Sequence, residues 1–201
     1  MTDPDRYVIP ATRGEATIVE KRSRFLALAA PVATSEEALA LVADRRREHH
    51  DAAHHAYAFR VGADERSSDD GEPSGSAGRP ILSAITAAGV ESVAVVVTRY
   101  FGGVKLGPGG LARAFGEAAR DALTQEGTEV RYHCRLVNVT FDFDLTSPVH
   151  HVVQKFEART VNSSYSNRAH MTLELRRSRL SSFIEALREA TAGRVEVADV
   201  A

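Results

Sequence analysis

Two short polar segments carry most of the residue types that could do chemistry. The first, SDDGEPSGSAG (68–78), places Asp69, Asp70 and Glu72 close together. Such acidic clustering could bind a hard cation or supply an acid/base pair. The spacing differs from the EF-hand pattern, and no partner base or nucleophile is defined. We therefore expect surface acidity, or a loop held against the basic residues of the second segment.

The second segment, RYFGGVKLGPGGLAR (99–113), follows a strand-like run and precedes a helix-like one. Its glycines permit positive φ and close approach of a ligand, and a helix N-terminus presents unpaired N–H groups to an anion. The segment matches neither GxxxxGK[ST] nor GxGxxG. The alternative is a sharp strand-to-helix turn whose glycines only allow close packing. The anion-binding candidates are Arg99, Gly102, Gly103, Lys105, Gly107, Gly109, Gly110 and Arg113.

His54 and His55 lie in an alternating run, His54–Val61, that predicts a strand. Adjacent residues on a regular strand point to opposite faces, so these two histidines are not expected to share a metal ion. We predict no metal site, no cofactor and no assigned catalytic residue. Cys134, the only cysteine, excludes an internal disulfide and is expected to be a buried small hydrophobe.

Composition limits the class of protein. A chain of 201 residues with 43% hydrophobic content suits one large or two small domains with real cores. The acidic N-terminus and the absence of a long apolar run predict a cytoplasmic protein with no membrane partner. A formal net charge of -2 argues against a wholly electrostatic nucleic-acid binder but allows a local basic patch.

The elements of the first half must position both segments. Ala16–Glu20 and Arg24–Val32 are predicted to form a hairpin across the polar KRSR turn, and Thr34 with Glu37 predicts a capping box. The three arginines 45–47 are expected to be a solvated face, with contact to an acidic partner as the alternative. Residues 62–78 are predicted to lack a regular element. Helices are predicted after Pro80 and along the stripe Leu111–Ala122, with a strand, Ser92–Tyr100, buried on both faces between them.

The second half predicts the order βαββαβ, which is the ferredoxin-like arrangement with both helices on one face of an antiparallel sheet. The expected strands are Arg131–Phe143, Thr160–Ser166, Ala169–Arg176 and Val195–Val200. The expected helices carry apolar stripes at Val149–Phe156 and Leu180–Leu187. We place the domain boundary between residues 133 and 134, giving an α+β chain with domains 1–133 and 134–201.

Three motifs, HHAYAF (54–59), SDDGEPSGSAGRPIL (68–82) and VVVTRYFGGVKLGPGGLARAF (95–115), together resemble the IMPACT family, in particular its bacterial YigZ-type members. The resemblance extends over nearly the whole chain. It implies an N-terminal domain like the second domain of ribosomal protein S-five and a C-terminal domain like that of elongation factor G. Pro108 stands where many members carry a small residue, and it removes one backbone donor from a phosphate cradle.

The resemblance implies an association with translation. Our first hypothesis is a non-enzymatic regulatory or binding protein that contacts RNA, the ribosome or a translation factor. It would do so through the two motif loops, with His54, His55, Asp69, Asp70 and Glu72 beside the glycine-rich segment. The alternatives are a phosphate- or nucleotide-recognising enzyme, which we consider less well supported, and an interaction scaffold without a small-molecule ligand. The sequence leaves the partner and the oligomeric state open.

Overall fold

The chain forms two compact units of mixed α/β structure. The computed structural model describes residues 3–124 and 127–200. One unit is Tyr7–Arg131, and the other combines Tyr132–Ala201 with Met1–Arg6. Strands β1 (Arg6–Pro10) and β7 (Thr128–Tyr132) pair with each other in a separate two-stranded sheet. The predicted two-domain α+β organisation is confirmed at this level.

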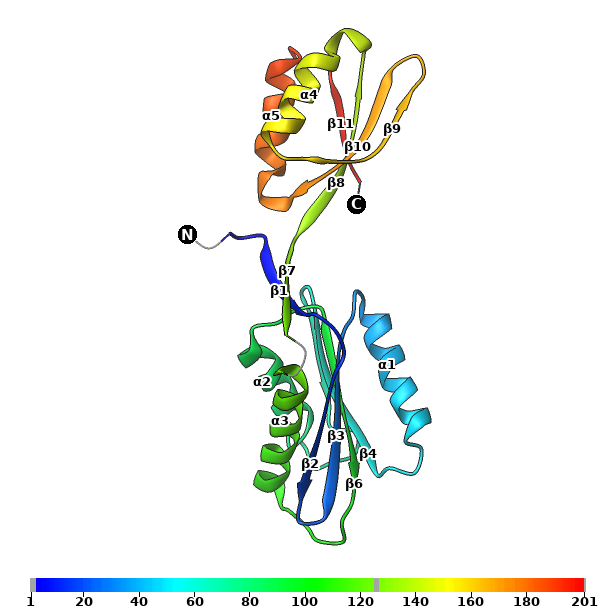
Figure 1. The fold of residues 1–201 in the computed structure, drawn as a ribbon, viewed down its shortest axis with the longest axis vertical. Coiled ribbons are helices and arrows are strands. Elements are labelled where there is room, and N and C mark those ends of the chain that lie inside the picture. Colours follow the sequence, from blue (N-terminus) through cyan, green and yellow to red (C-terminus); the bar gives the residue numbers. More distant parts are fainter. Residues whose placement is uncertain (1–2, 125–126, 201) are drawn as a thin grey trace. The chain divides into compact units, whose positions relative to one another are not determined.

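The unit Tyr7–Arg131 is built on a five-stranded antiparallel sheet in the order β2-β3-β6-β4-β5. Helices α2 and α3 cover one face, and α1 lies on the other (Figure 1). The strands are β2 (Gly14–Glu20), β3 (Ser23–Pro31), β4 (His54–Val61), β5 (Asp64–Ser68) and β6 (Val93–Tyr100). The helices are α1 (Ser35–Glu48), α2 (Gly78–Ala88) and α3 (Pro108–Thr124).

The central strand β6 is buried on both faces, as its continuous apolar run predicted. Val93, Val95 and Val97 pack with α2 and α3, whereas Ala94 and Val96 pack with α1. The same alternation in β4 sends Ala56 and Ala58 to the first core and Phe59 to the second. This confirms the predicted alternation of the strand that carries His54 and His55.

Helix α1 begins as predicted, because the Thr34 side chain accepts a hydrogen bond from the Glu37 N–H. The return bond differs in detail: the Glu37 carboxylate accepts from Ala33 N–H, at 2.7 Å. The expectation of a solvated arginine face at the other end is wrong for Arg45, which is buried and paired with Glu48 at 2.8 Å. Arg46 instead reaches an acidic partner within the chain, Asp70.

The prediction that residues 62–78 lack a regular element is also wrong. Residues Asp64–Ser68 form the edge strand β5 and pair with β4. The sequence DERSS contains no apolar residue, so the strand has no face to bury and is largely exposed. Backbone pairing with β4 along one side holds it in the sheet. Hydrophobic periodicity therefore cannot detect it.

The second unit has an antiparallel four-stranded sheet in the order β11-β8-β10-β9, with α4 and α5 on one face (Figure 1). The predicted βαββαβ order is confirmed. Its elements are β8 (Cys134–Phe141), α4 (Thr146–Lys155), β9 (Arg159–Tyr165), β10 (Ala169–Arg176), α5 (Leu180–Ala190) and β11 (Glu196–Val200). Short 3-10 turns, Phe143–Leu145 and Arg177–Arg179, precede the two helices.

Two predictions near the start of this unit are wrong. The single strand Arg131–Phe143 is broken at His133 into β7 and β8, because the His133 backbone bonds Asp5 and Arg177 instead. Cys134 is exposed rather than buried. Partial burial and the nearby Glu174 carboxylate raise the pKa of its thiol, which disfavours the reactive thiolate.

Among the described residues, no helix combines the length and the apolarity needed to cross a membrane.

Candidate functional site

The glycine-rich loop runs from the end of β6 to the start of α3, at the same end of the sheet as the β2–β3 turn (Figure 1). Gly102 packs directly on that turn: a Cβ there would lie 2.1 Å from the backbone carbon of Arg22. Its N–H also donates to Ser23 Oγ at 3.1 Å. Gly103 and Gly107 adopt φ of 81° and 75°. These glycines therefore have local structural reasons to be present, besides any role at a ligand.

The last two glycines and the cations of the segment have different surroundings. Gly109 faces open space, whereas a Cβ at Gly110 would meet Leu106 at 3.1 Å. Lys105 is exposed on the loop, and Arg113 is exposed one turn into α3. Arg99 is buried at the end of β6. The predicted cations therefore do not form one cluster.

Asp69 organises the acidic loop. Its carboxylate accepts backbone hydrogen bonds from Gly75, Ala77 and Gly78, at 2.8 to 3.0 Å. Two of these donors are at the start of α2, so Asp69 acts as a cap on that helix from outside it. Burial opposes ionisation, but the hydrogen bonds outweigh it and keep the pKa of Asp69 below its usual value.

Asp70 ties the loop to both histidines and to α1. Its carboxylate accepts from the His55 N–H at 2.7 Å and from Arg46 at 2.5 Å. The backbone oxygen of Asp70 lies 2.7 Å from His54 Nδ1. His55 is buried with Nδ1 3.1 Å from Thr98 Oγ1, and this burial lowers the pKa of the imidazole. His54 thus contacts the loop through its side chain, whereas His55 does so through its backbone N–H.

Glu72 and Arg99 form a buried ion pair between the two segments. Arg99 Nη1 donates to both carboxylate oxygens of Glu72, at 2.7 and 2.8 Å, and both side chains are less than one-tenth exposed. The Arg99 guanidinium carbon also lies 5.5 Å from the Phe25 ring and 5.4 Å from the Phe101 ring. The expectation that the acidic loop is held against the second segment is confirmed for this pair.

The two segments meet on one cleft of about 370 Å³. The acidic loop contributes Glu72 and Pro73, and the glycine-rich segment contributes the rest of the lining, namely Arg99, Phe101, Lys105, Leu106, Gly107, Pro108 and Leu111. The lining is mainly apolar. Its buried charges neutralise each other, and Lys105 is the one cation of the lining that carries no ion pair within the described parts of the chain.

This geometry favours a ligand that places an apolar group in the cleft and a negative charge next to it. It is less suited to an anion bound deep in the cleft. Glu72 already occupies the Arg99 guanidinium, and Pro108 at the first position of α3 supplies no N–H. Within residues 3–124 and 127–200, no group of three or more His, Cys, Asp or Glu side chains is arranged to hold a metal ion.

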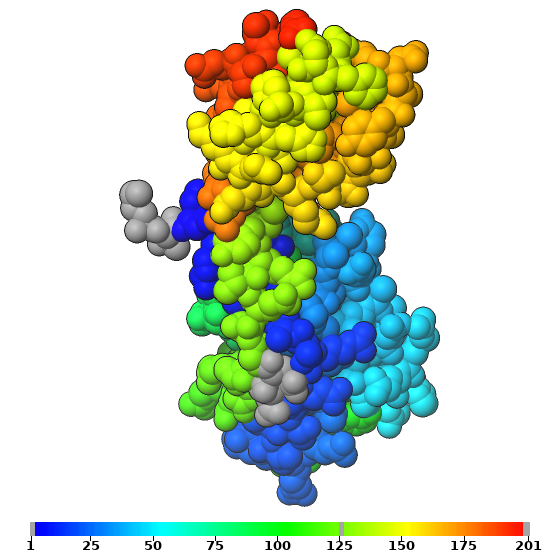
Figure 2. Space-filling view, turned by 45° about the horizontal axis from the view of Figure 1, so that its top comes forward, coloured from blue at the N-terminus to red at the C-terminus, as the bar shows by residue number. Residues whose placement is uncertain are grey.

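Two residues that the sequence did not mark lie beside the loop. Lys21 and Arg22 form the two-residue turn between β2 and β3, with φ of 44° and 66°. Both are exposed, and the turn projects at the lower end of the space-filling view (Figure 2). The sequence signal that could have identified them is a pair of basic residues in a two-residue hairpin turn, where Asn-Gly is the usual sequence.

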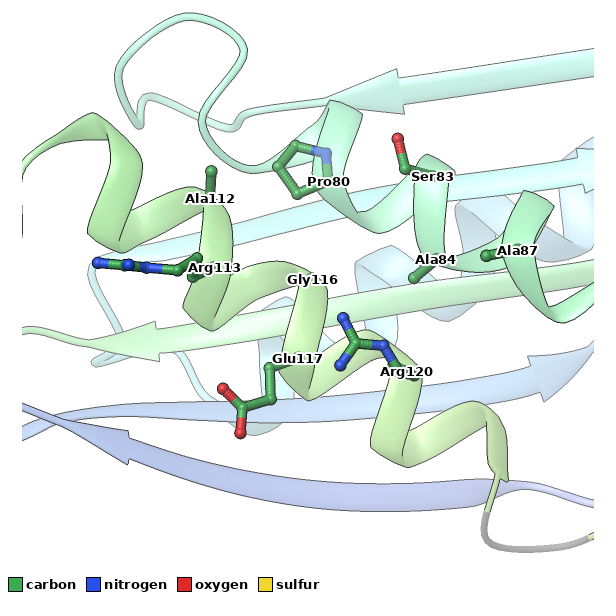
Figure 3. A pocket seen from close by; sticks show the side chains of 9 residues that line it. All are labelled: Pro80, Ser83, Ala84, Ala87, Ala112, Arg113, Gly116, Glu117 and Arg120. Atoms are coloured by element: carbon green, nitrogen blue, oxygen red, sulfur yellow. The ribbon is translucent and has the colours of Figure 1, made fainter.

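A larger groove of about 600 Å³ lies between α2 and α3 but fits the motifs less well. Helix α2 contributes only proline, serine and alanine side chains, and the three charged residues, Arg113, Glu117 and Arg120, all come from α3 (Figure 3). Of the predicted site residues, only Arg113 lines it. The cleft where the two segments meet is therefore the better candidate site.

Comparison with known proteins gives two matching family models. The Impact N-terminal domain matches residues 21–123, and a domain of unknown function (DUF1949) matches residues 139–194. An Escherichia coli (strain K12) protein, IMPACT family member YigZ, is 32% identical over 200 residues, which cover 96% of this chain and 97% of that protein. Both halves of the chain are therefore matched together in one relative.

Two further relatives match one part of the chain, and a solved structure matches nearly all of it. A Thermus thermophilus IMPACT family member is 60% identical over 103 residues, covering 51% of this chain and 56% of that protein. The Mus musculus Protein IMPACT is 31% identical over 115 residues, and the match spans 36% of it. A crystal structure titled as that of a hypothetical protein superposes with a TM-score of 0.71 at 29% identity, covering 98% of both chains.

Proposed function

Because this chain belongs to the IMPACT family, we propose that it is a non-enzymatic, translation-associated regulatory or binding protein. In this proposal it contacts RNA, the ribosome or a translation factor through the surface where its two signature loops meet. The observation that carries the proposal is the convergence of both loops on one cleft, with Lys105 on its lining and Phe101 54% exposed.

The arrangement suits binding better than catalysis. Asp69, Asp70 and Glu72 are all engaged by protein donors, so none of them is a free base. A phosphate-recognising enzyme remains the alternative hypothesis. It is less well supported, because Arg99 is neutralised and the α3 terminus lacks one donor at Pro108.

The proposal also includes the relationship of each domain to a known fold. The strand order β11-β8-β10-β9 supports a ferredoxin-like domain, similar to the C-terminal domain of elongation factor G, in residues 134–201. We propose that residues 1–133 are related to the second domain of ribosomal protein S-five. A role in translation would place the protein in the cytoplasm. Fold likeness is a weak guide to function, so the binding surface must be tested directly.

Co-sedimentation of purified protein with ribosomes and with total RNA, at low and high salt, tests the proposal. We expect salt-dependent binding that Lys105→Glu weakens about tenfold, because a cation next to a phosphate is replaced by an anion. Arg120→Glu is the matched control, since Arg120 is exposed on α3 but does not line the cleft. Equal binding by both variants and the native chain would refute the proposed surface.

A further inference from the structure

Many cations of this protein form ion pairs, but three that lie beside the cleft form none within the described residues. Elsewhere, arginines such as Arg60, Arg159 and Arg168 form ion pairs. Lys21, Arg22 and Lys105 form none with the residues that the structure describes, and all three are exposed. The contact of Gly102 with the backbone of Arg22 fixes the turn against the glycine-rich loop. The two cations of the turn are thus held beside the loop that carries Lys105.

The turn that carries two of these cations is also strained. With positive φ at both central residues it is a type I′ turn, which favours Asn-Gly. Lysine and arginine are poor choices for that backbone, because a Cβ is disfavoured in the left-handed region. Backbone strain of this kind persists where the side chains serve another purpose. The basic side chains are therefore better explained by a ligand than by the turn.

The neighbouring Phe101 is a large aromatic ring that is 54% exposed. It lines an apolar cleft whose volume lies in the range of small-molecule sites. A neutral, flat group suits this lining, whereas a phosphate would face the Glu72 carboxylate. Exposed aromatic rings beside unpaired cations are the means by which proteins bind single-stranded nucleic acid, since bases stack and phosphates pair.

We infer that this surface binds single-stranded RNA, with one unstacked base in the cleft against Phe101 and the flanking phosphates on Lys21, Arg22 and Lys105. The inference deepens the proposed function and rests on it. A duplex fits less well, because its bases are already stacked and only its phosphates would be used.

The base contact is tested by fluorescence anisotropy with two labelled oligomers of about 12 nucleotides. One is oligouridine RNA, and the other is an abasic ribose-phosphate chain of equal length and charge. We expect the abasic oligomer to bind roughly tenfold more weakly, because the stacking energy is lost. Phe101→Ala should weaken oligouridine binding by a similar factor and leave abasic binding unchanged. Phe143→Ala is the control, since Phe143 is 51% exposed in the other unit.

The phosphate contacts are tested with the double variant Lys21→Asn/Arg22→Gly. Asn-Gly fits the turn, so this variant should melt at the same or a higher temperature, and misfolding cannot explain a loss of binding. Binding to both oligomers should weaken, and the slope of log K against log salt should fall by about 1.4, which is two contacts at about 0.7 each. Arg120→Asn/Arg188→Asn is the charge-matched control, because it also removes two exposed positive charges and neither residue lines the cleft.

The outcomes separate this inference from the proposed function. Equal affinity for the two oligomers, or no effect of Phe101→Ala, overturns the base in the cleft. If Lys105-dependent co-sedimentation with ribosomes survives that result, the proposed function stands. If neither oligomer nor ribosomes bind, both fail. If the salt slope is unchanged in the Lys21→Asn/Arg22→Gly variant, the proposed phosphate contacts of the turn are refuted.

Discussion

At the scale of single residues, the three acids of the signature loop have separate structural tasks. Asp69 caps α2, Asp70 joins the loop to β4 and α1, and Glu72 neutralises Arg99. A cluster that looked suited to a cation or to acid/base chemistry is therefore occupied by protein donors. Substitution of any of these three acids is therefore expected to change the stability of the fold.

We predict that Asp69→Asn lowers the free energy of unfolding by about 2 kcal/mol, because one charged acceptor of three backbone N–H groups becomes a neutral amide. In the variant, the amide nitrogen would face one of those donors. Urea unfolding at neutral pH measures the change. Ser74→Ala, at an exposed position of the same loop, should change stability by less than about 0.5 kcal/mol. Equal effects of the two substitutions would contradict the capping role.

His55 should make stability depend on pH. Burial lowers its pKa in the folded state, so below about pH 6.5, the usual histidine value, the unfolded chain binds more protons than the folded one. Stability should therefore fall as the pH drops from about 7 toward the lowered pKa. Urea unfolding across this range should show a shallower dependence for His55→Gln than for His50→Gln, whose histidine is exposed. Identical slopes would show that His55 is not kept neutral by the fold.

At the scale of elements, the sequence predicted those that have an apolar face. The alternation in β4, the run in β6 and the stripe of α3 all depend on burial, and the structure confirms them. Edge strand β5 was missed because its DERSS sequence contributes backbone hydrogen bonds and no core residue. The break at His133 was missed because its cause is the distant Asp5.

The candidate site was predictable only in part, for the same reason. Each signature loop is visible as a local pattern, and the expected pairing of acidic and basic segments is realised by Glu72 and Arg99. The contribution of Lys21 and Arg22 depends on a contact across about 80 residues of chain, between Gly102 and the β2–β3 turn. Local periodicity carries no information about such a contact.

That contact leads to a prediction for the glycine-rich loop. Gly102→Ala should destabilise the protein by about 3 kcal/mol, because the new methyl group would overlap the backbone of Arg22 and Ser23 rather than a movable side chain. Gly109→Ala should be nearly neutral, since Gly109 faces open space. Thermal unfolding of the two variants gives the comparison. A neutral Gly102→Ala would mean that the loop and the turn are not packed as described.

At the scale of the whole molecule, the N-terminal residues belong to the unit formed by the C-terminal half. Asp5 is 1% exposed, and its carboxylate accepts hydrogen bonds from the N–H and the hydroxyl of Ser178. Its backbone oxygen accepts from His133 N–H at 2.8 Å. The sequence separation of 173 residues makes this closure invisible to any local pattern. The division into units is therefore not a simple cut of the chain.

Asp5→Ala should accordingly destabilise the unit that is remote from it in sequence. Removing the buried carboxylate breaks its charged hydrogen bonds with the N–H and the hydroxyl of Ser178, and we expect a loss of about 2 kcal/mol. Native-state hydrogen exchange resolves where the loss falls: amides of β8 and β10 should exchange faster, while those of β3 and β6 should not. Burial opposes ionisation of Asp5, but the Ser178 hydrogen bonds outweigh it and lower its pKa. The stabilisation should therefore be complete above the normal pKa of aspartate, about 3.9, and be lost as the pH falls from that value through the lowered pKa of the folded state. Faster exchange in β3 and β6 instead would assign Asp5 to the other unit.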